Sequence, residues 1–131
     1  MASVTTKLKW DGDVVKIRGQ KVRNKSIFEI GLVVEGNAKQ LAPVDTGRLA
    51  GSITTQSKDE SSGGGADTIS KPATDGVVLV GTAVEYAPYM EFGTSKTDAQ
   101  AFLRPALRLA SGQELTIVKK NSKYYFGDYL S

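Results

Sequence analysis

The chain has 131 residues, a net charge of +3 at neutral pH, and neither histidine nor cysteine. These absences exclude Ser-His-Asp and Cys-His nucleophile pairs, typical zinc sites, disulfides and thiol redox chemistry. The pI of about 9.1 is only mildly basic, and the basic residues are dispersed, so charge alone does not indicate nucleic-acid binding. No apolar run approaches the roughly 20 residues of a membrane span. This length is typical of a single domain, here residues 1–131.

The first predicted element is a long helix from about Asp13 to Leu41. Asp13 is a good N-cap residue, and apolar side chains recur at helical spacings along the segment. Gly19 marks a point where the helix is expected to weaken. The helix must end by Ala42, because Pro43 disfavours the helical conformation of the residue before it.

A compact turn motif follows the helix, comprising Pro43, Asp45, Thr46 and Gly47. Asp45 and Thr46 can hydrogen-bond to nearby backbone groups, and Gly47 can adopt a positive φ without steric cost. The segment Arg48 to Ser57 then alternates apolar and polar residues, which predicts a half-buried strand. We therefore interpret the motif as a corner between helix and strand.

A long polar connection, residues 58–76, separates this strand from the next. It contains three consecutive glycines and no apolar periodicity, so we expect a flexible loop. A short apolar run from Val77 to Val80 predicts a buried strand, paired antiparallel with the strand before the loop. Tyr86 to Phe92 is expected to add a short, irregular edge strand, because Pro88 lacks a backbone N–H.

A second helix is expected towards the C-terminus, starting near Asp98 or, because Pro105 fits only a first helical turn, near Arg104. The apolar residues around Ile117, in the C-terminal tail of residues 112–131, are compatible with either a helix or a strand. Four aromatic residues lie in this tail, and they indicate either a packed segment or an exposed partner-binding strip. The order of elements predicts an α+β fold, with a long N-terminal helix packed on a small antiparallel sheet.

Three sequence motifs carry a resemblance to a known family. They are A-P-V-D-T-G-R-L at Ala42–Leu49, Y-A-P-Y-M-E-F-G-T at Tyr86–Thr94 and F-L-R-P-A-L at Phe102–Leu107. In this order they resemble the tail-completion or head–tail joining proteins of long-tailed bacteriophages, also called minor tail or neck proteins. Ala101 departs from the pattern, since the family often has proline there.

The resemblance implies a structural virion protein rather than an enzyme, with no cofactor and no metal. It implies a homo-oligomeric ring, typically a hexamer, at the head-proximal end of the tail. The expected partners are other copies of the chain, the tail tube protein and the head-completion or connector protein, and DNA passes through the channel without specific recognition. The expected location is the virion, and the host cytoplasm during assembly.

The second motif is rich in side chains that interfaces favour, so we expect it to meet a neighbouring subunit. Glu91 would then pair with a basic residue of the neighbour, such as Arg104 or Arg108. The candidate interface residues are Tyr86, Tyr89, Met90, Glu91, Phe92, Arg104 and Arg108.

Two other functional classes remain open from the sequence. The alternative function is a small basic nucleic-acid-binding module, which salt-sensitive binding to generic DNA would favour. The other class is a hydrolase with a metal ion held by carboxylates such as Asp45, Glu85 and Glu91. We expect neither Gly63–Gly65 nor their surroundings to bind phosphate, because no strand-then-helix pattern flanks them.

Overall fold

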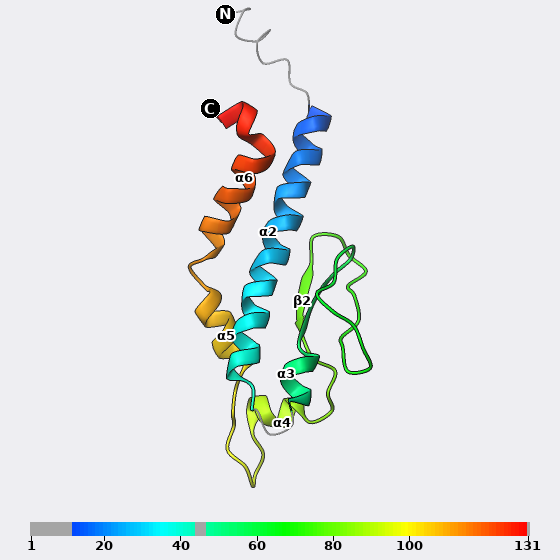
Figure 1. Ribbon diagram of the computed structural model, residues 1–131, viewed down its shortest axis with the longest axis vertical. Helices are drawn as coiled ribbons and strands as arrows, with labels where there is room; N and C mark the ends of the chain where they lie inside the picture. Colours follow the sequence, from blue (N-terminus) through cyan, green and yellow to red (C-terminus); the bar gives the residue numbers. More distant parts are fainter. Residues whose placement is uncertain (1–11, 44–46, 131) are drawn as a thin grey trace, which may run out of the picture.

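The computed structural model describes residues 12–43 and 47–130, and it confirms the α+β class. A long helix forms the axis of the molecule, with two helices on one side and a two-stranded sheet on the other (Figure 1). The elements are α2 (Gly12–Leu41), α3 (Arg48–Ser52), β1 (Thr54–Ser57), β2 (Val78–Gly81), α4 (Ala87–Phe92), α5 (Leu103–Ala110) and α6 (Glu114–Leu130). None of the helices in the described part of the chain is long and apolar enough to cross a membrane.

Helix α2 runs unbroken through Gly19, so the expected weakening there does not interrupt it. Gly31 has a clear role in this helix, because the sheet crosses it closely. A Cβ atom at Gly31 would lie 2.6 Å from the Thr55 side chain and 2.8 Å from that of Val78. The Thr55 hydroxyl also donates a hydrogen bond to the Gly31 carbonyl oxygen. The glycine therefore lets helix and sheet approach one another.

The sheet consists of β1 and β2 paired antiparallel, as the sequence predicts, with Thr55 opposite Val80. The prediction that the first strand begins at Arg48 is wrong, since Arg48–Ser52 forms the short helix α3. Leu49 and Ile53 are both buried, a spacing of four that fits a helical turn as well as an alternating strand.

The predicted edge strand from Tyr86 to Phe92 is also wrong. Ala87–Phe92 forms helix α4, with Pro88 in its first turn. Backbone N–H groups in the first turn of a helix have no partner within the helix. The missing N–H of Pro88, which suggested a strand edge, therefore also suits the start of a helix.

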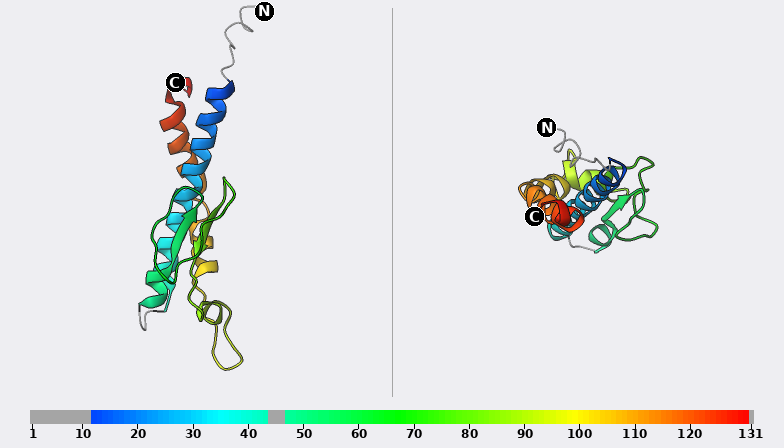
Figure 2. Two further views of the ribbon diagram at one scale, coloured as in Figure 1. Left: turned by 90° about the vertical axis from the view of Figure 1, so that its right-hand side faces the viewer. Right: turned by 90° about the horizontal axis from the view of Figure 1, so that it is seen from above.

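Helix α5 begins at Leu103 and places Pro105 in its first turn, close to the later of the two predicted starts. The C-terminal tail forms α6, which packs along α2 (Figures 1 and 2). Asn121 of α6 is buried and donates a hydrogen bond to the Ser26 hydroxyl of α2. Tyr124 remains 80% exposed, so the tail is packed against α2 and still presents an aromatic side chain outward.

The connection between the strands has no helix and, apart from a bridge between Gln56 and Ser61, no strand pairing. It is nevertheless attached to the body at several points. Asp75 pairs with Arg23 of α2 at 2.7 Å, and Ser62 hydrogen-bonds to Glu35. These polar contacts are not evident from the loop's sequence, and mobility of this segment in solution stays a prediction.

Candidate interface where the three motifs meet

The three sequence motifs converge on one end of α2. The first motif follows the C-terminus of α2, the second forms α4, and the third starts α5 beside them (Figure 1). Each motif contributes to a single buried apolar cluster, which includes Ala42, Leu49, Ala87, Phe102 and Ala106. The motifs are therefore parts of one structural joint.

Gly47 confirms the conformation predicted for the turn. Its φ is +70°, it precedes the first residue of α3, and its carbonyl accepts a hydrogen bond from the Gly51 N–H. Pro43 is half-buried. Asp45 and Thr46, the other members of the turn motif, lie outside the described residues.

Arg48, the first residue of α3, joins this corner to two other segments. Its guanidinium donates to the Asp67 carboxylate at 2.9 and 3.0 Å and to the Glu85 carboxylate at 3.2 Å. It also lies 5.7 Å from the centre of the Tyr86 ring. Hydrogen bonds from Arg48 lower the pKa of Asp67. Arg48 thus attaches the long loop and the start of the second motif to the first motif.

Glu91 links the second motif to the third. Its carboxylate accepts backbone hydrogen bonds from Phe102 at 3.2 Å and Leu103 at 2.8 Å, at the N-terminus of α5. Arg104 donates to the same carboxylate through Nε at 2.8 Å and to the Glu91 carbonyl oxygen through Nη2 at 2.7 Å. An acidic side chain here satisfies N–H groups that the helix leaves unpaired and complements its dipole.

The environment of Glu91 favours its charged form. Burial alone would raise the pKa of this carboxyl, whose residue is only 5% exposed, but the hydrogen bonds from Arg104 and the α5 backbone outweigh burial. The pKa is therefore lowered from its ordinary value of 4.5. Within the chain Arg104 already holds the Glu91 carboxylate, and pairing of Glu91 with a neighbouring subunit stays a prediction.

The other candidate interface residues divide between core and surface. Met90 and Tyr86 are half-buried and pack against the core. Tyr89 and Phe92 are 59% and 68% exposed on α4, and the Arg104 guanidinium lies 4.8 Å from the centre of the Phe92 ring. Arg108 is exposed on α5. We call Tyr89, Phe92 and the outward side of Arg104 the aromatic surface.

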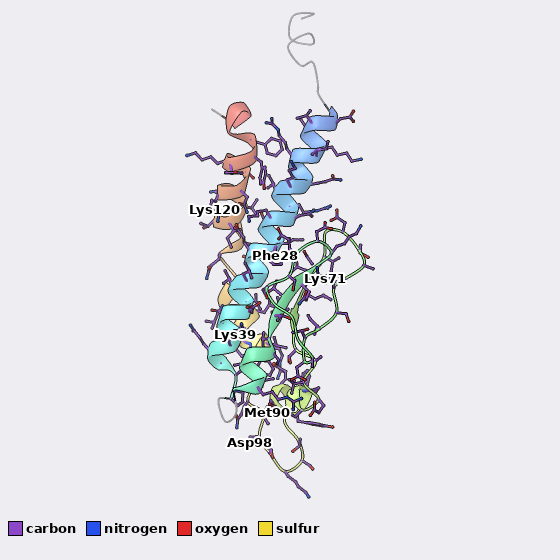
Figure 3. The ribbon with its side chains drawn as sticks, turned by 45° about the vertical axis from the view of Figure 1, so that its right-hand side comes forward. Phe28, Lys39, Lys71, Met90, Asp98 and Lys120 are labelled. Atoms are coloured by element: carbon purple, nitrogen blue, oxygen red, sulfur yellow. The ribbon has the colours of Figure 1, made fainter. Side chains whose placement is uncertain are left out.

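A shallow apolar hollow of about 540 Å³ adjoins the aromatic surface. Val84, Ala87 and Phe102 line it from the inside, and Phe92 and Leu103 line its rim. The aromatic surface and this hollow lie towards the end of the molecule where Figure 3 labels Met90 and Asp98, away from Lys120 of α6.

The described residues do not assemble the metal site that the hydrolase interpretation requires. Within residues 12–43 and 47–130, no group of three or more acidic side chains is placed to hold a metal ion. Glu85 is paired with Arg48 and Glu91 with Arg104, while Asp45 falls in the gap. The carboxylates of this region serve as partners of arginine.

Sequence reasoning missed Asp67, Arg48 as a linking residue, and the exposed leucines of α5, Leu107 and Leu109. Leu107 and Leu109 are 62% and 60% exposed on a helix of only eight residues. Arg48 could have been found from the sequence, because an arginine that directly follows a turn motif invites a search for carboxylate partners. No local signal identified Asp67, which lies in the polar loop.

The comparisons with known proteins give one result. A family model described as "Bacteriophage HK97-gp10, putative tail-component" matches residues 3–93 of this chain. The comparisons with curated proteins and with solved structures gave no match. The matched range contains the first motif and all of the second except Thr94, and it ends at Gly93, before the segment that leads to α5.

Proposed function

Because this chain belongs to the HK97-gp10-like family of bacteriophage tail components, we propose that it forms a ring at the head-proximal end of the phage tail. In this proposal the ring terminates the tail tube and joins it to the head-completion complex. Its stoichiometry is six, and DNA passes through its channel without sequence recognition. A structural tail component is located in the virion, and the proposal adds host cytoplasm as the place where assembly occurs.

The observation that carries the proposal is the aromatic surface. Tyr89 and Phe92 are more than half exposed although Ala87 of the same motif belongs to the core, and Tyr86 and Met90 pack against it. Aromatic side chains are enriched in the parts of interfaces that carry most of the binding energy. The buried Glu91 carboxylate and Gly93 hold α4 in place, so the surface is presented on a fixed support.

The elongated shape of the chain is consistent with a subunit that meets different neighbours at its two ends. The start of α2 and the end of α6 lie at one end, and α4 lies at the other (Figure 1). Exposed lysines, Lys16, Lys21 and Lys123, lie near the first end together with the exposed ring of Tyr124, whereas Tyr89 and Phe92 are exposed at the second end. The two faces of a ring of such subunits are built from different elements, as a joint between two different structures requires.

Complementation of a phage that lacks this protein tests the proposal. We expect Tyr89→Ala and Phe92→Ala proteins to fold, because both side chains are largely exposed, and to leave free heads and free tails in place of virions. Ile17→Ala is the matched control, since it removes an apolar side chain of similar exposure, 52%, at the other end of α2. Folding of each variant is checked by thermal unfolding.

Normal yields of infectious particles from both folded α4 variants would contradict the placement of the interface. Loss of virions with Ile17→Ala as severe as with the α4 variants would show that the aromatic surface has no special role. Accumulation of joined particles with tails of abnormal length would favour tail termination over head joining as the main task.

A further inference from the structure

The sheet has an open edge at β2. The Thr55 N–H donates to the Ser62 hydroxyl at 2.8 Å, so it points away from β2. In an antiparallel pair, hydrogen-bonded and non-hydrogen-bonded residue pairs alternate. Thr55 and Val80 are therefore a non-hydrogen-bonded pair, and the N–H and C=O groups of Val78 and Val80 point outward from the free side of β2.

The opposite edge of the sheet is already covered. The Ser57 N–H donates to the Glu60 carbonyl oxygen at 2.8 Å, and the Ser62 N–H donates to that of Thr55 at 3.0 Å. Within the described residues, no other strand pairs with β2 on its free side. An open edge is a ready template for one further strand.

An apolar groove runs beside this open edge. It has a volume of about 450 Å³ and lies between β2, α2 and α5. Val78 and Val80 form its β2 side, and Ile30, Val34 and Leu107 are among the side chains that form the rest. Leu103 and Arg104 line both this groove and the hollow next to the aromatic surface, so the two are adjacent. A strand added at β2 would place every second side chain in the groove.

We propose that residues 4–10 of a second copy of this chain add to the open edge of β2 and fill the groove. In this segment Val4, Thr6, Leu8 and Trp10 alternate with Thr5, Lys7 and Lys9. That pattern matches a strand with one apolar and one polar face. The apolar set would enter the groove, and the lysines would face water beside Leu79, which is 42% exposed.

Chain length argues for a second copy over the molecule's own N-terminus. Gly31, which touches Val78 and Val80, lies about 28 Å along α2 from Gly12 at 1.5 Å per residue. An extended chain covers at most about 3.5 Å per residue, so about eight residues are needed to return along the helix. Residues 4–10 lie within eight residues of Gly12, so in the same chain they would be used up by this return and could not pair with β2. A neighbour in the proposed ring has no such limit, and one donated segment per subunit closes a ring.

This inference rests on the proposed function, and cysteine cross-linking in assembled particles tests it. The chain has no cysteine, so two introduced cysteines report only on each other. A phage lacking this protein is complemented with two variants together, one carrying Lys7→Cys and the other Leu79→Cys. Directly opposite residues on adjacent strands lie within about 5.5 Å. Thr5→Cys and Lys9→Cys are tested in the same way to cover other registers.

We expect a disulfide-linked pair of chains in purified particles for at least one of the three positions. Lys123→Cys with Leu79→Cys is the control, and it should give no linked pair. Particles that contain the protein but show no link at any position would overturn the inference while leaving the proposed function intact. Particles without the protein would overturn both.

Two further outcomes would also overturn the inference. Linkage of Leu79→Cys chains to one another would show that two β2 edges pair directly. When both cysteines are placed in one chain, linkage within that chain and never between chains would show that the molecule's own N-terminus covers the edge.

Discussion

Two glycines in the joint have positive φ for different structural reasons. Gly47 has φ +70° and ψ −10°, near the left-handed helical region, and a Cβ atom there would meet nothing within 4 Å. Gly93 has φ +77° and ψ 176°, a region that is essentially restricted to glycine. A Cβ atom at Gly93 would also lie 2.7 Å from the Ala99 backbone nitrogen. The two positions should therefore tolerate substitution differently.

We expect Gly47→Val to lower the free energy of unfolding by more than about 1 kcal/mol, because a β-branched residue fits this conformation poorly. Gly47→Asn should cost less, since asparagine adopts the left-handed conformation more readily. Asparagine should give no such relief at Gly93, where both the conformation and the neighbouring backbone exclude a side chain. Denaturant unfolding measures all three, and equal losses for Gly47→Asn and Gly93→Asn would contradict this distinction.

Glu91 makes the joint sensitive to acid. Its pKa is lowered in the folded chain, so it contributes stability above its ordinary value of 4.5, and this contribution is lost as pH falls through the folded-state pKa. Glu91→Gln should reduce the free energy of unfolding at neutral pH by about 1–3 kcal/mol, the usual cost of weakening a buried charged hydrogen-bond set.

The pH dependence gives a sharper test of Glu91 than stability at one pH. The difference in unfolding free energy between the native chain and Glu91→Gln should be constant above pH 4.5 and shrink below it. Glu60→Gln, at an exposed position, is the control and should leave the pH profile close to that of the native chain. A difference that does not change with pH would mean that the Glu91 charge is unimportant.

Among the elements, α6 is attached to α2 through polar as well as apolar contacts. The buried Asn121 side chain donates to the Ser26 hydroxyl at 3.1 Å and to Glu29 at 3.4 Å. Lys120 pairs with Glu29 at 2.8 Å. Burial would raise the pKa of Glu29, but the hydrogen bonds from Lys120 and Asn121 outweigh it and the pKa is lowered. Such directional bonds fix the register of one helix on another.

A double-mutant cycle tests this attachment of α6. Ser26→Ala alone should destabilise the chain by roughly 1–3 kcal/mol, because it removes a partner of the buried Asn121 amide. Ser26→Ala with Asn121→Leu should cost less than the sum of the two single changes, because neither polar group then remains unpaired. Thermal or denaturant unfolding measures the cycle, and strict additivity would show that the two side chains do not depend on each other.

The elements that could be predicted from the sequence are those set by local patterns. The apolar period and Pro43 defined α2 and its end, and Val77–Val80 with its flanking glycines defined β2. Helix α3 was missed because five residues containing Gly51 give too short a pattern to separate a helical from an alternating period. Helix α4 was missed because Pro88 suits both a strand edge and a helix start.

The candidate site was less accessible to prediction because its contacts join distant segments. Glu91 was singled out from the sequence as an interface residue, but its observed contacts are with backbone groups eleven to thirteen residues further along the chain. The link from Arg48 to Asp67 spans 19 residues, most of them in a loop without a periodic pattern. The exposure of Tyr89 and Phe92 also depends on tertiary packing, since their motif gives no sign of which aromatics enter the core.

At the scale of the whole molecule, the long helix α2 forms the axis, and the surfaces at its two ends differ. The motif joint and the aromatic surface occupy one end, and the α2–α6 helix pair forms the other (Figures 1 and 3). The open edge of β2 and its groove lie on the side between them. In the proposed ring, this separation would place neighbours along the tail axis at the ends and neighbours within the ring at the side.

Electron microscopy of intact virions, compared with tails assembled without this protein, tests the central proposal most directly. The account predicts a layer of density at the head-proximal end of the tail that is present in virions, repeats six times around the tail axis and is missing from the deficient tails. Density for this protein at the distal tip or along the tube, or a head-proximal end that is unchanged by its absence, would contradict the account.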